Sequence, residues 1–138
     1  KQFSLYRANI KNEFEEILKI EAQRSKSGTT QDSSTIQIVN MLLERGYEQG
    51  ASDIHIEPQE DHTVIRFRID GVMHEVITIP KSAHEFLISR IKVMAKLRTD
   101  EHQMPQDGKL QYEVDDQKID VRVSIVPTTK GENAVMRR

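Results

Sequence analysis

Arginines that alternate with apolar residues are the side chains in this sequence best suited to bind a ligand. In "DVRVS" (120–124) Arg122 stands between two valines, and in "AVMRR" (134–138) Arg137 follows an apolar run. The alternation in "DVRVS" places Arg122 on one face of a β-strand, opposite the apolar side chains, and Arg137 lies near the end of the terminal strand. A guanidinium held on a rigid strand presents a planar fork that matches a phosphate group. The alternative is a surface cation or ion pair, which contributes little by itself.

Arg90 and Lys109 are secondary candidates for the same chemistry. Arg90, in "SRIK", lies at the edge of a helical apolar stripe, and Lys109 follows "PQDG" (105–108). In "PQDG" the proline fixes one backbone angle, the aspartate can bond its own downstream amides, and the glycine permits a positive φ. We therefore expect a turn over 105–108, with Lys109 at the start of a strand.

Two clusters combine carboxylates with a histidine: Asp53, His55 and Glu57, and Asp100, Glu101 and His102. The first cluster shares one strand face and could ligate a metal ion. Ligands from a single strand rarely complete such a site, so we favour a solvated or domain-contact face and expect no metal. The second cluster could serve acid–base catalysis. Polarity at a helix end is the simpler explanation, and we expect no catalytic residue there.

The sequence lacks the motifs of a self-contained enzyme. G-x-x-x-x-G-K-[ST], G-x-G-x-x-G and G-x-S-x-G are all absent, and the 138 residues include no cysteine. Lys and Arg number 20 against 22 Asp and Glu, so no overall field draws the chain to nucleic acid or anionic lipid. The three tyrosines and four phenylalanines form no basic-aromatic patch, and we expect no nucleic-acid partner.

The apolar pattern predicts an α+β domain in which helices pack on a mainly antiparallel sheet. Helical spacing over 1–24 is followed by a Ser-, Thr- and Gly-containing segment over 25–34, which we expect to be a flexible linker. The main domain is expected over 35–138, with a first helix capped by Ser34 or Thr35 and ending near Leu43.

About six short strands are expected in this main domain, with a second helix after the third strand. The expected strands are "SDIHIEP", "TVIRFRID", "VMHEVITI", "KLQYEV", "KIDVRVSIV" and "NAVMRR". Asp70-Gly71 and Asp115-Asp116 are expected to form tight hairpin turns. Pro80 opens the second helix. The apolar positions expected to face the core from that helix are Ala83, Phe86, Leu87, Ile91, Met94 and Leu97.

Five blocks of the sequence resemble one protein family in the same order. They are "GASDIHIEP" (50–58), "RFRIDGVMHEV" (66–76), "ISRIKVMAKL" (88–97), "PQDGK" (105–109) and "IDVRVSIVPTTKGENAVMRR" (119–138). The family is that of the secretion ATPases of type II secretion and type IV pilus assembly. The resemblance covers about Ser34 to Arg138. It implies a second N-terminal, PAS-like domain that precedes a RecA-like ATPase domain, with 1–24 as a linker helix from an upstream region.

The resemblance also implies a function, an assembly and a cellular location. In family members the active unit is a homo-hexamer, and ATP with Mg²⁺ is bound by the C-terminal RecA-like domain. The N-terminal module closes over that ATP and supplies arginines to its phosphates, and by position Arg122 and Arg137 correspond to such arginines. Because the Walker A loop would lie beyond Arg138, we expect this chain alone to be inactive and without a cofactor. The expected location is the cytoplasm, at the inner membrane through a platform protein.

The sequence departs from the family pattern around the "PQDG" segment. Family members usually carry arginine two residues before the proline and directly after the glycine, where this chain has Gln103 and Lys109. Gln103 cannot bind phosphate as a cation, and Lys109 keeps the charge but loses the fork. The alternative interpretation is therefore a PAS-like interaction module for hexamer assembly or docking to the platform protein, with no nucleotide contact.

Overall fold

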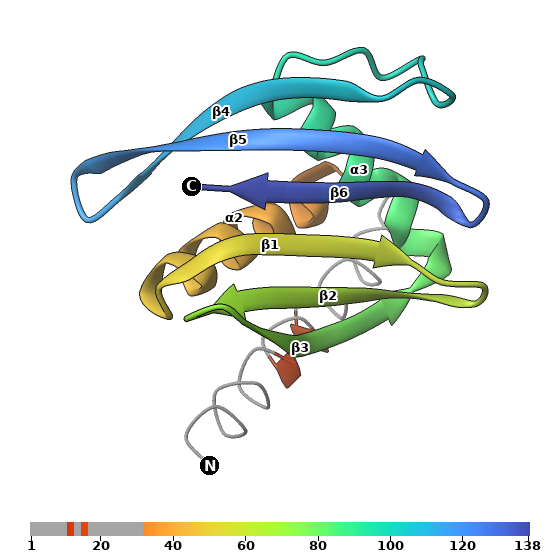
Figure 1. Cartoon of the computed structure of the whole chain (residues 1–138). Coiled ribbons are helices and arrows are strands. Elements are labelled where there is room, and N and C mark those ends of the chain that lie inside the picture. The colour runs from red at the N-terminus through yellow and green to blue at the C-terminus, as the bar shows by residue number, and fades with distance from the viewer. Residues whose placement is uncertain (1–10, 13–14, 17–31) are drawn as a thin grey trace.

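The computed structural model describes residues 11–12, 15–16 and 32–138. Two helices and six strands follow one another along the main part of the chain (Figure 1). They are α2 (Asp32–Glu48), β1 (Ala51–Pro58), β2 (His62–Ile69), β3 (Val72–Pro80), α3 (Lys81–Met94), β4 (Gln106–Val114), β5 (Gln117–Thr128) and β6 (Gly131–Arg137). The expected α+β class is confirmed, and all six expected strands are present.

The six strands form one antiparallel sheet in the order β3-β2-β1-β6-β5-β4. The last strand, β6, lies between β1 and β5, so the carboxyl end of the chain occupies the middle of the sheet (Figure 1). Figure 1 shows α2 and α3 on the same side of the sheet, where α2 contacts β1 and α3 contacts β2 and β3. No described helix covers the other face, which we call the open face.

Alternation along each strand separates the core from the open face. On β5, Val121, Val123 and Ile125 are buried, whereas Arg122 is exposed and Ser124 half-buried. The largest fully buried apolar side chains come from both helices and from the inner face of the sheet: Phe67, Leu42, Leu43, Ile56, Ile65, Leu87, Ile91, Ile125, Met136 and Val39. Burial of these side chains fixes which face each strand turns inward, because a one-residue slip would expose the whole set.

Two tight hairpins join neighbouring strands where the sequence predicts them. Asp70 and Gly71 have φ of 51° and 79°, and Asp115 and Asp116 have φ of 51° and 61°. Paired left-handed residues match the right-handed twist of the two strands they connect. Aspartate tolerates this conformation better than most residues, so the second hairpin forms without glycine.

The prediction of a turn over 105–108 is wrong. Strand β4 already begins at Gln106, and Gly108 and Lys109 pair with Val123 and Arg122 of β5. Gly108 is not in the left-handed region. A Cβ atom there would lie 2.8 Å from Cδ2 of Leu97 and 2.9 Å from the carbonyl oxygen of Ala95. The glycine is therefore explained by the close approach of the segment after α3, not by a turn.

The predicted core face of α3 needs a partial correction. Leu87 and Ile91 are buried as expected, but Phe86 is 49% exposed. The buried face also includes Ile88, together with two polar residues, His84 and Lys92. Ala83, Met94 and Leu97 pack against the core while remaining partly accessible. The buried face of α3 is therefore rotated relative to the predicted one. Burial of the His84 imidazole and the Lys92 ammonium group is possible because polar partners, described below, form hydrogen bonds with both.

The leading part of the chain is largely outside the described residues. This applies to the linker helix expected over 1–24, apart from four helical positions at 11–12 and 15–16, and to most of the linker expected over 25–34. Helix α2 begins at Asp32, before the expected cap at Ser34 or Thr35, and ends at Glu48, five residues beyond the expected end near Leu43. Within the described ranges, no helix combines the length and apolarity that crossing a membrane requires.

Candidate functional site

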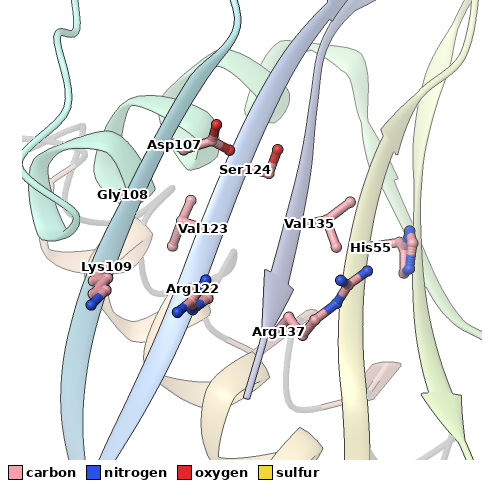
Figure 2. Close-up of a pocket in the computed structure, with 9 residues that line it drawn as sticks. All are labelled: His55, Asp107, Gly108, Lys109, Arg122, Val123, Ser124, Val135 and Arg137. Atoms are coloured by element: carbon pink, nitrogen blue, oxygen red, sulfur yellow. The ribbon is translucent and has the colours of Figure 1, made fainter.

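Three cationic side chains on the open face line one pocket of about 650 Å³ (Figure 2). They are Lys109 of β4, Arg122 of β5 and Arg137 of β6, and we call them the cation row. Lys109 lies directly opposite Arg122, and Arg122 directly opposite Arg137, in the registers of the two strand pairs. The remaining lining residues are His55, Asp107, Gly108, Val123, Ser124 and Val135.

The register of the sheet brings like charges together in this row. Directly opposite residues on antiparallel strands have Cβ atoms about 4.5–5.5 Å apart, and like charges in such positions are destabilising. Here two successive cross-strand pairs are both cationic. An anion placed over the row would relieve this repulsion, so the arrangement suits a multiply charged anionic ligand.

Few groups neutralise the cation row. Arg122 and Lys109 are exposed, and neither has an ion-pair partner among the described residues. Arg137 is partly compensated, since its Nη2 donates to Oδ2 of Asp53 at 3.4 Å. Figure 2 shows the Arg137 side chain extending from β6 toward β1, the strand that carries Asp53.

A second row of polar residues runs beside the cations. Asp107 lies opposite Ser124, and Val135 lies between Ser124 and His55 in the registers of the neighbouring strands. This row brings a carboxylate, a hydroxyl and an imidazole into the pocket next to the cations (Figure 2). Such groups can orient a bound anion or accept hydrogen bonds from its hydroxyl groups.

Arg90 and Gln103 do not line the pocket. Arg90 is half-buried on α3, and its Nε is buried without a hydrogen-bond partner among the described residues. Gln103 lies in the exposed segment before β4, where its amide N–H donates to Oε2 of Glu101. Of the four arginine and lysine candidates, the structure therefore brings together Arg122, Arg137 and Lys109.

Arginines pair with the two carboxylates of the Asp53, His55 and Glu57 cluster. Glu57 pairs with Arg66, with Oε1 3.0 Å from Nε, and Asp53 pairs with Arg137. Across the part of the chain that the structure describes, no three His, Asp or Glu side chains group as metal ligands. This face therefore consists of charge pairs around the cation row.

In the second predicted cluster, Asp100 and His102 have different side-chain partners. Asp100 pairs with Arg98 at 3.1 Å, and this hydrogen bond lowers the pKa of Asp100. His102 turns instead to Glu132, with Nδ1 2.9 Å from Oε1. The cluster does not form one acid–base site.

A buried polar group beneath the sheet was not predicted from the sequence. Lys92 is fully buried, and its Nζ lies 2.7 Å from Oε2 of Glu132 and donates to the Glu101 carbonyl at 2.6 Å. Burial by itself raises the pKa of Glu132, but the hydrogen bonds from Lys92 and His102, with their charges, outweigh it and lower the pKa. The only sequence signal was a lysine directly beside Ile91 in a helical apolar stripe.

His84 lies beside this group and is also buried. Its Nε2 donates to the Glu132 carbonyl at 2.7 Å, because a carbonyl can only accept, so Nδ1 accepts from Oγ1 of Thr63 at 3.0 Å. Desolvation lowers the pKa of His84, and the hydrogen bond to the Glu132 carbonyl opposes that shift. His84 thus joins α3 to both β2 and β6.

Comparison with known proteins gives a consistent set of relatives. The family model described as "Type II/IV secretion system protein" matches residues 28–138. Type II secretion system protein HxcR of Pseudomonas aeruginosa is 48% identical over 109 residues, which are 78% of this chain and 23% of that protein. Type II secretion system ATPase E of Vibrio cholerae is 44% identical over 106 residues, which are 77% of this chain and 21% of that protein.

A pilus protein and a solved structure are also similar. Type IV pilus assembly ATPase PilB of Myxococcus xanthus is 43% identical over 107 residues, 77% of this chain and 19% of that protein. The chain therefore spans about a fifth of the length of the curated relatives it matches. The crystal structure of the pilus retraction motor PilT with bound ADP aligns with a TM-score of 0.44 and 15% identity, over 70% of this chain and 27% of that chain.

Proposed function

The chain belongs to the type II/IV secretion system protein family, and we propose that it is a non-catalytic regulatory domain of a secretion or pilus-assembly ATPase. Two of the relatives are named as ATPases, and the chain spans about a fifth of each. The sequence lacks the G-x-x-x-x-G-K-[ST] loop that cradles phosphates in such enzymes. In this proposal hydrolysis takes place in another domain, which the family resemblance implies is RecA-like.

We propose that the open face is the part of this chain that contacts the nucleotide. In this proposal it closes over ATP held by the RecA-like domain, with Arg122 and Arg137 in contact with the phosphates and Lys109 beside them. The observation that carries the proposal is the cation row, in which these three residues are aligned across three adjacent strands and line one pocket. Its role would be electrostatic stabilisation of the charge on the transferred phosphoryl group.

The wider assembly follows from the family resemblance. The functional unit would be a homo-hexamer in the cytoplasm, held at the inner membrane through a platform protein of a secretion or pilus machine. ATP fits the cation row by charge. In this proposal the accompanying Mg²⁺ is bound together with ATP by the RecA-like domain. Closure of the open face would then report the nucleotide state as a domain rotation.

Turnover of the full-length protein tests this function. We expect Arg122→Ala to lower kcat for ATP at least about tenfold, because removing a preorganised charge or donor from a transition state costs catalysis directly. Arg98→Ala is the matched control, since Arg98 is exposed and pairs with Asp100 away from the pocket. An Arg122→Ala protein with unchanged turnover would contradict the proposal.

The second candidate function, an interaction module, is favoured by one observation on α3. Phe86 and Val93 are 49% and 54% exposed and lie seven residues apart, so they share one face of the helix. Arg90, with its unpartnered Nε, lies between them. We expect Phe86→Ser with Val93→Ser to weaken hexamer formation of the full-length protein if α3 is a subunit contact. Arg122→Ala would leave assembly intact.

A further inference from the structure

Asp53 is a buried carboxylate on the open face. Its side chain is 8% exposed, and among the described residues it is the one aspartate or glutamate in the buried set. Three groups approach Oδ2: Nη2 of Arg137 at 3.4 Å, Nε2 of His55 at 3.5 Å and Nε of Arg68 at 4.0 Å. His55 is in proximity only, because its Nε2 forms no hydrogen bond within the described structure. A carboxylate this deeply buried requires such compensation.

Asp53 lies at one end of the cation row, beside Arg137. Asp53 on β1 lies directly opposite Arg137 on β6 and, on its other side, opposite Arg68 on β2. A register shift between Ala51 and Asp53 marks a β-bulge immediately before it. Bulges of this kind re-aim side chains and are over-represented beside functional sites. The bulge lets Ala51 point into the core while Asp53 points to the open face.

Within the cation row, Asp53 contacts Arg137 and not Arg122 or Lys109. The contact uses Nη2, so Nε and Nη1 of Arg137 remain without partners among the described residues. The Arg137 side chain is 65% exposed. A long, exposed arginine loses rotamer freedom when it binds an anion, and a contact that already holds one edge of the guanidinium reduces this loss.

We propose that Asp53 is a positioning residue of the anion site, which holds Arg137 so that its remaining N–H donors face the pocket beside Arg122. This inference rests on the function proposed above. Arg68 also lies beside the carboxylate, with Nε 4.0 Å from Oδ2, so Arg137 shares the compensation of this buried charge. Simple charge repulsion makes the opposite prediction, since a nearby carboxylate would weaken anion binding. The two effects therefore differ in sign.

The test is a double-mutant cycle on the 138-residue chain with inorganic tripolyphosphate as the probe. Affinities come from NMR titration of the arginine side-chain Nε–Hε signals, which detect weak binding. We expect Asp53→Asn to weaken binding about fivefold when Arg137 is present and to change it little in the Arg137→Ala background, as coupled neighbours do. Asp120→Asn is the matched control: it removes the same charge from the open face, but Asp120 is bonded to Gln111 and contacts no arginine of the row.

Each outcome supports or overturns a defined statement. Equal or tighter binding by Asp53→Asn, or the same loss with and without Arg137, would overturn the positioning role. If the unsubstituted chain does not bind tripolyphosphate, the positioning role is overturned, whereas the proposed function is judged by turnover of the full-length protein. If Arg122→Ala and Arg137→Ala leave tripolyphosphate binding unchanged, the cation row is not the anion site and the proposed function fails as well. Should Asp53→Asn not fold, Asp53→Glu provides the same comparison at constant charge, and we expect it also to weaken binding.

Discussion

Lys92 and Glu132 form an ion pair of 2.7 Å between Nζ and Oε2, with side chains that are 1% and 11% exposed. Lys92 lies on α3 and Glu132 near the start of β6, while Nζ also donates to the Glu101 carbonyl in the segment that leads to β4. The pair therefore fixes the connection from α3 to the strand that brings Lys109 into the cation row. Its effect on the site is indirect and passes through the position of β4.

Loss of the Lys92 charge is expected to destabilise the fold. Lys92→Met keeps much of the side-chain length but leaves the Glu132 carboxylate largely buried, with His102 as its one remaining side-chain partner among the described residues. Breaking one half of a buried pair costs about 3 kcal/mol of unfolding free energy, measured by chemical denaturation. Lys118→Ala, at an exposed position of β5, should change it by less than about 0.5 kcal/mol. A Lys92→Met loss as small as that of the control would show that the pair contributes nothing to stability.

A methyl group at Gly108 is expected to disturb both stability and the pocket. In Gly108→Ala the new Cβ would meet Leu97 and the Ala95 carbonyl within 3 Å, and a backbone carbonyl cannot move aside cheaply. Overpacking of this kind costs about 1–3 kcal/mol, and the shift of β4 should also weaken tripolyphosphate binding through Lys109. Gln111→Ala, three residues along on the same strand, is the control. Wild-type stability in Gly108→Ala would contradict the close approach described here.

The alternation of apolar and polar residues along the chain predicted most of the fold, because this pattern is a local property of each strand. Each strand carries its own apolar face, and the Asp70-Gly71 turn has its own conformational preference, so neither required knowledge of distant residues. The Gly108 prediction failed for the opposite reason. Its explanation lies in contact with Ala95 and Leu97, and a sequence pattern does not show such an approach.

The candidate site was predictable by residue type but not by geometry. Alternation placed Arg122 on an outward face, and the family resemblance selected Arg137. The alignment of both with Lys109 depends on the registers of two strand pairs, and β6 pairs with β1 as well as β5. Asp53 was assigned to a solvated or domain-contact face, with metal binding as the alternative, and its pairing with arginine was missed because that partner lies 84 residues away in the sequence.

Stability is expected to fall as the pH drops below neutrality, first through His84. Burial lowers the folded-state pKa of His84 beneath the unfolded value of 6.5, so protons bind the unfolded chain more readily. The contribution of the neutral imidazole is therefore complete above about pH 6.5 and is lost as the pH falls toward the folded pKa. Thermal melting between pH 7.5 and 5 measures this loss. His84→Gln should flatten that part of the curve, and exposed His62→Gln should retain it.

A second decline is expected at lower pH through Glu132. Its folded-state pKa lies below the ordinary glutamate value of 4.5, so its stabilising contribution is present above that value and disappears as the pH falls through the folded pKa. Glu132→Gln should remove this acidic decline while lowering stability at pH 7, because Lys92 loses its charged partner. A melting curve of Glu132→Gln that still falls as steeply below pH 4.5 would assign the decline to other carboxylates.

Restoring an arginine at position 109 should strengthen the cation row. Lys109 presents a single ammonium group opposite Arg122, whereas arginine in the same place would offer a planar fork that binds two phosphate oxygens at once. We expect Lys109→Arg to tighten tripolyphosphate binding about threefold. Lys118→Arg, on the same sheet but outside the pocket lining, controls for the change of residue type and should have no effect. Equal gains from both substitutions would show that the affinity follows general charge chemistry and not the geometry of the row. A gain confined to position 109 would place the ligand against β4 and β5, where Lys109 and Arg122 lie opposite each other.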